Sequence, residues 1–279
     1  MHTIEQLPPA QTFEIALGST ASREQIEMSL RTILLDTDQP SLFFQALRKS
    51  DTLDRWFGEL KDLIGVQQNP VYHAEGDVWN HTMMVLDQGA KLRERASDPY
   101  GFMLAALTHD FGKAVCTEEK NGVLHAYRHE ILGLPIAKRC LKRLDIAPER
   151  IAYVLNLVEL HMKPNTMAKA NSKERSTTRL FDDAIDPDGL LCIALADDRG
   201  RITSTPGTGT EAFLNERLAL YRELMARPHV TERDLADAEL PSQQFPTLLE
   251  FAHKLRLAGV DKENALKQTL GHARKLHSK

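Results

Sequence analysis

The chain has 279 residues, of which 42% are hydrophobic and 27% charged, and its formal net charge is −4. This composition is typical of an ordinary globular protein, and the negative balance argues against a globally basic surface for nucleic acid. No apolar run approaches the roughly 18 residues of a membrane span, and the N-terminus has no signal-peptide pattern. Cys116, Cys140 and Cys192 form no CxxC pair, which favours a reducing compartment, so we expect a cytoplasmic protein without a membrane partner.

Helical periodicity dominates the chain from about residue 22 onward. Residues 22–35 place Ile26, Leu30, Ile33 and Leu34 on one apolar stripe, and Ser41 is expected to cap the next helix. Further helices are predicted over 77–94, 101–110, 129–144, 148–161, 188–198 and 211–226. Residues 122–129 form a weak strand candidate, and residues 163–178 and 200–210 are predicted loops. We therefore predict an all-α fold, with a boundary near residues 228–245.

Six polar residues lie on the buried faces or at the ends of these predicted helices. Ala105 and Ala106 share a face with His109, and Val78 and Val85 share one with His81. The six are His81, His109, Asp110, His129, His161 and Asp197. One such residue is more often a hydrogen-bonded core group than a ligand. Four imidazoles and two carboxylates together supply the donors for one or two divalent cations, because helix ends can converge on one side of a bundle.

The donor types indicate which metals fit and what chemistry follows. Imidazole-rich sites with carboxylates suit Mn, Fe, Co, Ni or Zn, whereas Mg²⁺ is less natural with so many imidazoles. A divalent ion lowers the pKa of bound water and polarises a phosphoryl oxygen. Lys113, three residues after Asp110, offers a positive charge for a phosphate; alternatively it is a solvated lysine at a helix end.

The spacing of His81, the adjacent pair His109-Asp110 within HDFGK, and the distant Asp197 resembles the signature of the HD superfamily of metal-dependent phosphohydrolases. The resemblance implies that these four residues hold a divalent ion. His129 and His161 resemble the extra ligands of HD proteins with two-metal sites.

A closer resemblance, from about residue 22 to 260, is to the neck and HD body of bacterial tRNA nucleotidyltransferases, the CCA-adding enzymes. It is carried by residues 40–90, by HAYRHEILGLPIAKRCLKRL and by LADDRGR. It implies an all-α HD bundle at 61–228, between a helical neck-like segment at 1–60 and a helical tail at 229–279. About twenty residues precede the neck-like stretch, and LGSTASREQ contains no carboxylate pair of a catalytic head. We therefore expect no CCA addition by this chain alone.

The resemblance also implies phosphatase and 2′,3′-cyclic phosphodiesterase or 2′-nucleotidase activity, on a small nucleotide or an RNA 3′ end. Asp110, Lys113 and Glu130 are the candidate catalytic residues, Glu130 as a proton donor or as an orienting neighbour of His129. Arg199 and Arg201 match the family's ADxRGR-like element, and either contact phosphate or pair with nearby carboxylates. Hydrolysis of a dNTP or an alarmone at the same metal site is a further alternative.

A hypothesis of another class is an RNA-binding module or subunit that holds tRNA for a separate catalytic partner. The neck-like and tail-like flanks and the basic segment 163–175 motivate it. Lys163, Lys169, Lys173 and Arg175 would contact the phosphate backbone, and binding would weaken steeply with salt.

Overall fold

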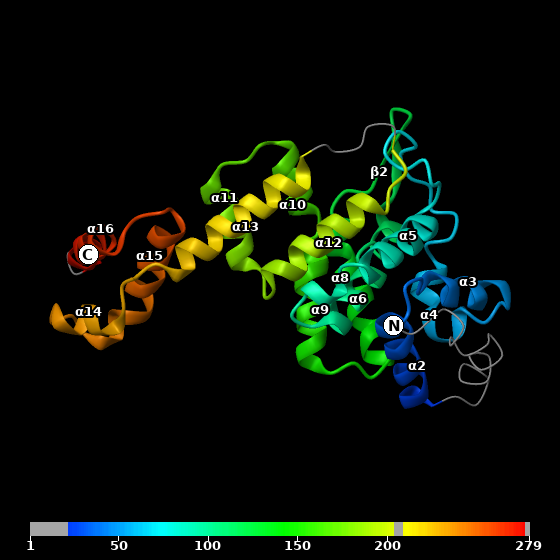
Figure 1. Ribbon diagram of the computed structural model, residues 1–279, viewed down its shortest axis with the longest axis horizontal. Coiled ribbons are helices and arrows are strands. Elements are labelled where there is room, and N and C mark those ends of the chain that lie inside the picture. The colour runs from blue at the N-terminus through cyan, green and yellow to red at the C-terminus, as the bar shows by residue number, and fades with distance from the viewer. Residues whose placement is uncertain (1–21, 204–208, 277–279) are drawn as a thin grey trace. The chain divides into compact units, whose positions relative to one another are not determined.

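The computed structural model describes residues 22–203 and 209–276, and most of this part is helical, which confirms the all-α prediction (Figure 1). The strands in these ranges are β1 (Glu118–Lys120) and β2 (Val123–His125), an antiparallel hairpin with Glu118 opposite His125. Part of this hairpin coincides with the strand candidate at 122–129. Within the same ranges, every helix is too short or too polar to cross a bilayer.

The chain forms two compact units. Unit 1 consists of residues 1–169 and 184–210, and unit 2 of residues 170–183 and 211–279. These units do not follow the predicted borders at residues 60 and 228, because the first helices pack into unit 1 and residues 211–226 belong with the tail. The three-part division into functional domains stays a prediction, and residues 1–21 of its first part lie outside the described residues.

The neck-like segment contains α2 (Arg23–Asp36), α3 (Ser41–Lys49) and α4 (Asp54–Lys61), which pack on α6, α5 and α8 respectively. Ser22 and Gln25 form a capping box that starts α2. The prediction that Ser41 caps α3 is wrong: Ser41 is the first helical residue, and Pro40 precedes it. The Ser41 amide and hydroxyl instead donate to Asp87 at 3.1 and 2.8 Å, which ties α3 to α5.

The core of unit 1 is built around α6 (Pro99–Thr108), which contacts α5 (Val78–Ala90), α9 (Pro148–Leu160) and α12 (Pro187–Arg199). Every residue of α6 after Pro99 is buried, and residues 189–197 of α12 are buried as well. Helices that are apolar on all sides occupy the centre of a domain. Polar residues that follow such helices directly, as His109 and Asp110 follow α6, are therefore placed inside the protein.

The other helices of unit 1 are η2 (Arg93–Arg95), α7 (Lys113–Cys116), α8 (His129–Arg143) and α10 (Met162–Lys169). The loop predicted at 163–178 is wrong, because α10 and the first residues of α11 (Glu174–Asp183) occupy it. The segment lacks apolar periodicity since buried polar side chains anchor it: Asn165 donates to Ala194 O at 2.9 Å, and Thr178 donates to Leu257 O at 2.9 Å. Residues 204–208 of the second predicted loop lie outside the described ranges.

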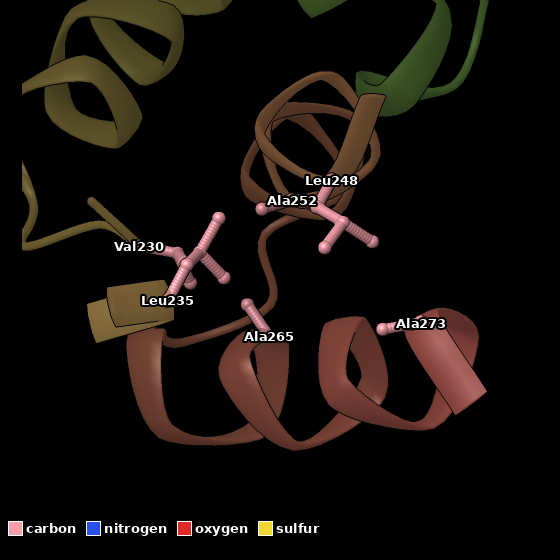
Figure 2. Packing of buried hydrophobic residues seen from close by; sticks show 6 residues of the cluster. All are labelled: Val230, Leu235, Leu248, Ala252, Ala265 and Ala273. Carbon is pink, nitrogen blue, oxygen red and sulfur yellow. The ribbon is translucent and has the colours of Figure 1, made fainter. Parts of the chain in front are cut away.

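Unit 2 contains α11, α13 (Thr210–Ala226), α14 (Glu232–Asp237), η3 (Ser242–Gln244), α15 (Phe245–Leu257) and α16 (Lys262–Leu276). Its small core, shown in Figure 2, joins the start of α14 to α15 and α16 through Val230, Leu235, Leu248, Ala252, Ala265 and Ala273. Alanines on the facing helices let the backbones approach closely. A Thr231–Asp234 capping box begins α14.

Candidate metal centre

Asp110 lies where four imidazoles converge. His81 is carried by α5, His109 caps the C-terminus of α6, His129 opens α8, and His161 caps the C-terminus of α9. The Nε2 atoms of His109 and His81 lie 3.2 and 3.6 Å from Asp110 Oδ2. The Nε2 atoms of His129 and His161 lie 3.3 and 3.9 Å from Asp110 Oδ1. Each carboxylate oxygen therefore faces two imidazoles.

Asp197 completes the set from the end of α12. Its Oδ1 lies 3.1 Å from His81 Nε2, and its other oxygen pairs with the Arg201 guanidinium. All six predicted metal ligands thus lie in one cluster. For Arg201, the structure has the ion pair with a neighbouring carboxylate that was one of its two predicted roles.

The histidine rings are held so that Nε2 points inward. In His109, His129 and His161, Nδ1 lies 2.9, 2.8 and 2.6 Å from the backbone carbonyl three residues earlier. A carbonyl oxygen can only accept, so Nδ1 carries the hydrogen and a neutral ring keeps its lone pair on Nε2. Such bonds on the outer nitrogen are the usual way in which metal-binding histidines are oriented.

The cluster is buried, and several of its polar atoms make no hydrogen bond. His81, His109 and His161 have no exposed surface, and Asp110 is 1% exposed. Within the described ranges, Nε2 of His81, Nε2 of His109 and both Asp110 oxygens are buried without a partner in hydrogen-bond geometry. A buried polar atom without any partner costs roughly 1–3 kcal/mol, and here the Lys113–Asp110 and His81–Asp197 contacts offset part of that cost. A divalent cation among them would use these lone pairs.

Two triads of possible ligands meet at Asp110: His81 and His109 with Asp110, and His129 and His161 with Asp110. Within each triad the ligand atoms lie within 4.8 Å of one another. A carboxylate shared between two triads fits the predicted range of one or two divalent ions.

The electrostatics keep both carboxylates and His161 in forms that can bind a cation, whereas they favour the protonated form of His81. Burial alone would raise the pKa of Asp110, but His109 and Lys113 beside it hold that pKa well below its usual range. Arg201 and His81 do the same for Asp197. Burial, with His109 and His129 nearby, lowers the pKa of His161 to about 3, so this ring is neutral. The pKa of His81 is raised, because Asp197 and Glu75 outweigh its burial.

Of the other predicted site residues, Lys113 and Glu130 lie beside this cluster. Lys113 is buried, not solvated: its Nζ lies 2.7 Å from Asp110 Oδ2 and donates to Gln68 Oε1 at 2.8 Å. The Glu130 carboxylate lies 3.8 Å from His129 Nδ1, on the side of the ring opposite Asp110. Arg199 is exposed on the last turn of α12, unlike every predicted metal ligand.

Sequence reasoning missed Glu75 and His73. Glu75 Oε1 lies 2.7 Å from His73 Nδ1 and 3.2 Å from His81 Nδ1, and Glu75 Oε2 accepts the Ile202 amide at 2.9 Å. These bonds outweigh burial and lower the pKa of Glu75 to about 2. The available signal was the HAE tripeptide just before Asp77, the N-cap of the helix that carries His81.

Two glycines were also missed. A Cβ atom on Gly112 would clash with the backbone oxygen of His129 and would lie 2.7 Å from the backbone nitrogen of Gly133. Glycine, which has no Cβ, therefore allows the turn after Asp110 to approach α8 closely. A Cβ on Gly200 would lie 2.6 Å from Val85 Cγ2. Gly200 O in turn lies 3.2 Å from His81 Nδ1. These contacts join residues far apart in the sequence, so local patterns do not reveal them.

Comparison with known proteins matches residues 78–201 to the HD domain, a span that includes all six predicted ligands. The chain is 31% identical over 233 residues to the multifunctional CCA protein of Methylococcus capsulatus, covering 79% of this chain and 50% of that protein. It is 30% identical over 165 residues to the protein of the same name from Actinobacillus pleuropneumoniae, covering 57% and 40% respectively. The chain thus spans half or less of the length of these relatives, and it carries an HD-domain region that resembles the corresponding part of multifunctional CCA proteins.

Proposed function

We propose that this chain is a metal-dependent phosphohydrolase that acts on a nucleotide phosphoester, as a 2′,3′-cyclic phosphodiesterase, 2′-nucleotidase or phosphatase. The observation that carries the proposal is the convergence of four imidazole Nε2 atoms on one buried carboxylate, with under-used lone pairs. His81, His109, Asp110 and Asp197 would hold one divalent ion, and Asp110, His129 and His161 a second. When bound, such an ion supplies Lewis acidity toward water and a phosphoryl oxygen.

The chain's own residues have separate tasks in this proposal. Lys113 is kept in place by Asp110 and Gln68, so its ammonium can offset negative charge on phosphoryl oxygens in a largely buried site. Arg201 neutralises part of the Asp197 charge and orients that carboxylate. Glu130, 26% exposed in its side chain, is the candidate proton donor to the leaving group.

The direct experiment measures hydrolysis of 2′,3′-cyclic AMP by chelator-stripped protein, with Mn²⁺, Co²⁺, Ni²⁺ and Mg²⁺ added back in turn. We expect turnover that depends on the metal, with Mg²⁺ the weakest. Lys113→Met keeps much of the side-chain volume but removes the charge, and should slow turnover while metal retention persists. Absence of turnover with every metal, in protein that binds metal, would refute this substrate class.

A second candidate function is RNA binding by unit 2, in a chain that works with a separate catalytic partner. A cavity of about 750 Å³ in this unit is lined by Lys173, Arg175, Arg217 and Arg227, with Glu174 as the single carboxylate among its lining residues. Such a charge balance suits a phosphate backbone, of a tRNA for example. Binding should then weaken steeply with salt, and Lys173→Ala with Arg175→Ala should reduce that dependence. Undetectable or salt-independent binding would exclude this function.

For the compartment, we keep the cytoplasm as the proposal. The free state of Cys116, Cys140 and Cys192 supports it, because disulfides are rare in reducing compartments.

A further inference from the structure

A cavity of about 410 Å³ adjoins the metal cluster within unit 1. It shares Lys113 and His129 with the cluster, and its remaining walls come mainly from residues between 67 and 73 and from strand β2 with Ala126 after it. Small-molecule sites usually measure about 300–1,000 Å³. The cavity therefore has room for a group larger than a phosphate, next to the place where a phosphoester would be cleaved.

Gln68 offers an unused donor in this cavity. The residue is 7% exposed, and its Oε1 accepts from Lys113 Nζ at 2.8 Å. Its Nε2 is buried and has no hydrogen-bond acceptor in the described part of the chain. A buried amide N–H without an acceptor is costly, so this atom indicates a ligand oxygen or nitrogen at this point of the cavity.

Large exposed side chains gather around the same cavity. Tyr72, a lining residue, is 52% exposed, and its neighbour Val71 is 57% exposed. On the other wall His125 stacks on Tyr127, with ring centroids 4.9 Å apart and planes 10° apart, and Tyr127 is 57% exposed. Grouped exposed apolar surface marks binding sites, and flat aromatic rings are the usual stacking partners of unpaired bases.

We propose that this cavity binds the nucleoside part of the phosphoester, with its base against Tyr72 and His125 and one of its acceptor atoms at Gln68 Nε2. The inference rests on the proposed function for the location of the phosphate, which Lys113 and the metal cluster would hold. A simple phosphate or sugar phosphate would leave both the rings and the Gln68 amide unused. Tyr72, His125 and Gln68 are thus specificity-determining residues that select nucleotides over other phosphoesters.

The test compares AMP with ribose 5-phosphate, which lacks the base, by calorimetric binding to the purified protein with its metal. AMP should bind on the order of tenfold more tightly or more, the usual size of a base–aromatic stacking effect. Tyr72→Ala and His125→Ala should remove most of this preference, and Gln68→Ala should weaken AMP binding. Ile185→Ala, which removes an equally exposed apolar side chain of unit 1, should keep the preference.

Equal affinity for the two ligands, a preference that survives both aromatic variants, or no binding of either ligand at millimolar concentration would overturn the inference. The hydrolysis assay reports separately on the proposed function. Loss of turnover with an intact AMP preference would refute only the phosphohydrolase, and turnover without a base preference would refute only this cavity's role.

Discussion

Each unit of this protein contains a histidine–aspartate contact with nearly the same nitrogen–oxygen distance. In unit 1, His81 Nε2 lies 3.1 Å from Asp197 Oδ1, and in unit 2, His253 Nε2 lies 2.9 Å from Asp182 Oδ2. The side chains of His253 and Asp182 are 38% and 25% exposed, whereas those of His81 and Asp197 are 0% and 5% exposed. Water solvates the His253–Asp182 pair, and ion pairs of this kind contribute at most about 1 kcal/mol to the stability of the fold.

The His81–Asp197 pair is buried and has no such access to solvent. A buried charge pair costs free energy unless further partners compensate for it. Unit 1 adds three more imidazoles and Asp110 in the same buried space, and among the described residues several of their atoms have no partner in hydrogen-bond geometry. The difference between the units indicates that burial and convergence, not the residue types, distinguish a candidate metal centre from a surface ion pair.

The largest difference between the two units is expected when one aspartate is removed from each of them. Asp110→Ala should abolish metal retention and reduce hydrolysis below detection, because Asp110 belongs to both ligand triads. Asp182→Ala should retain metal and activity, since it removes a half-exposed pair. Elemental analysis and turnover assays measure both, and circular dichroism controls for folding. Full activity in Asp110→Ala would contradict the metal centre.

Gly112→Ala should separate the turn after Asp110 from α8 and so displace His129. We expect a destabilisation of roughly 1–3 kcal/mol, the usual cost of overpacking, with weaker metal retention. Gly271→Ala is the matched control, because a Cβ there meets nothing within 4 Å and alanine favours a helix. Urea unfolding of both variants gives the comparison. Equal stabilities would show that this close approach does not position His129.

Glu75→Gln keeps the shape of the side chain but removes the charge that faces His73 and His81. Substituting a residue that hydrogen-bonds a metal ligand typically lowers metal affinity by about 10–100-fold. We expect Glu75→Gln to lower it by an amount in that range. Glu250→Gln, at an exposed pair with Lys254, should leave the affinity unchanged. A competition titration with a chelator of known affinity measures this. An unaltered affinity in Glu75→Gln would mean that Glu75 does not orient His81.

The smallest expected effect concerns pH. Burial lowers the pKa of His73 from 6.5 to about 4, so the folded state keeps this ring neutral where the unfolded state takes up a proton. Stability is therefore lost as the pH falls from about 6.5 toward 4. Between pH 7.5 and 5.5 the His73 contribution is roughly 1 kcal/mol. In metal-free protein, acidification from pH 7.5 to 5.5 should therefore lower the free energy of unfolding of His73→Asn by about 1 kcal/mol less than that of the wild type, as measured by urea unfolding at the two pH values. An identical pH dependence in the two proteins would contradict the neutral state.

The sequence was sufficient for the elements whose signals are local. The apolar runs before His109 and Asp197 predicted buried helices that end in buried polar residues, and the spacing around His81 predicted that its ring points inward. The loop predicted at 163–178 failed because buried amide and hydroxyl bonds, such as those of Asn165 and Thr178, replace the apolar stripe there. Polar anchoring of this kind leaves no periodicity in the sequence.

The surroundings of the predicted ligands were less predictable than the burial of these residues. Gln68 contacts Lys113 across 45 positions, and His81 meets the Gly200 carbonyl across 119. Such pairs depend on how helices pack, and no local motif encodes them. Lys113 shows the consequence: the motif suggested a phosphate contact or a solvated helix end, and only the packing buries it beside Asp110.

The most direct test of the central claim is a Co²⁺ titration of the chelator-stripped wild-type protein, followed by visible absorption and by the unfolding temperature. The cluster predicts saturable binding of one or two ions per chain, with an absorption band from imidazole and carboxylate ligands. It also predicts a rise in the unfolding temperature that grows with free metal, because only the folded state assembles the site. No bound Co²⁺ and an unchanged unfolding temperature up to millimolar metal would contradict the account.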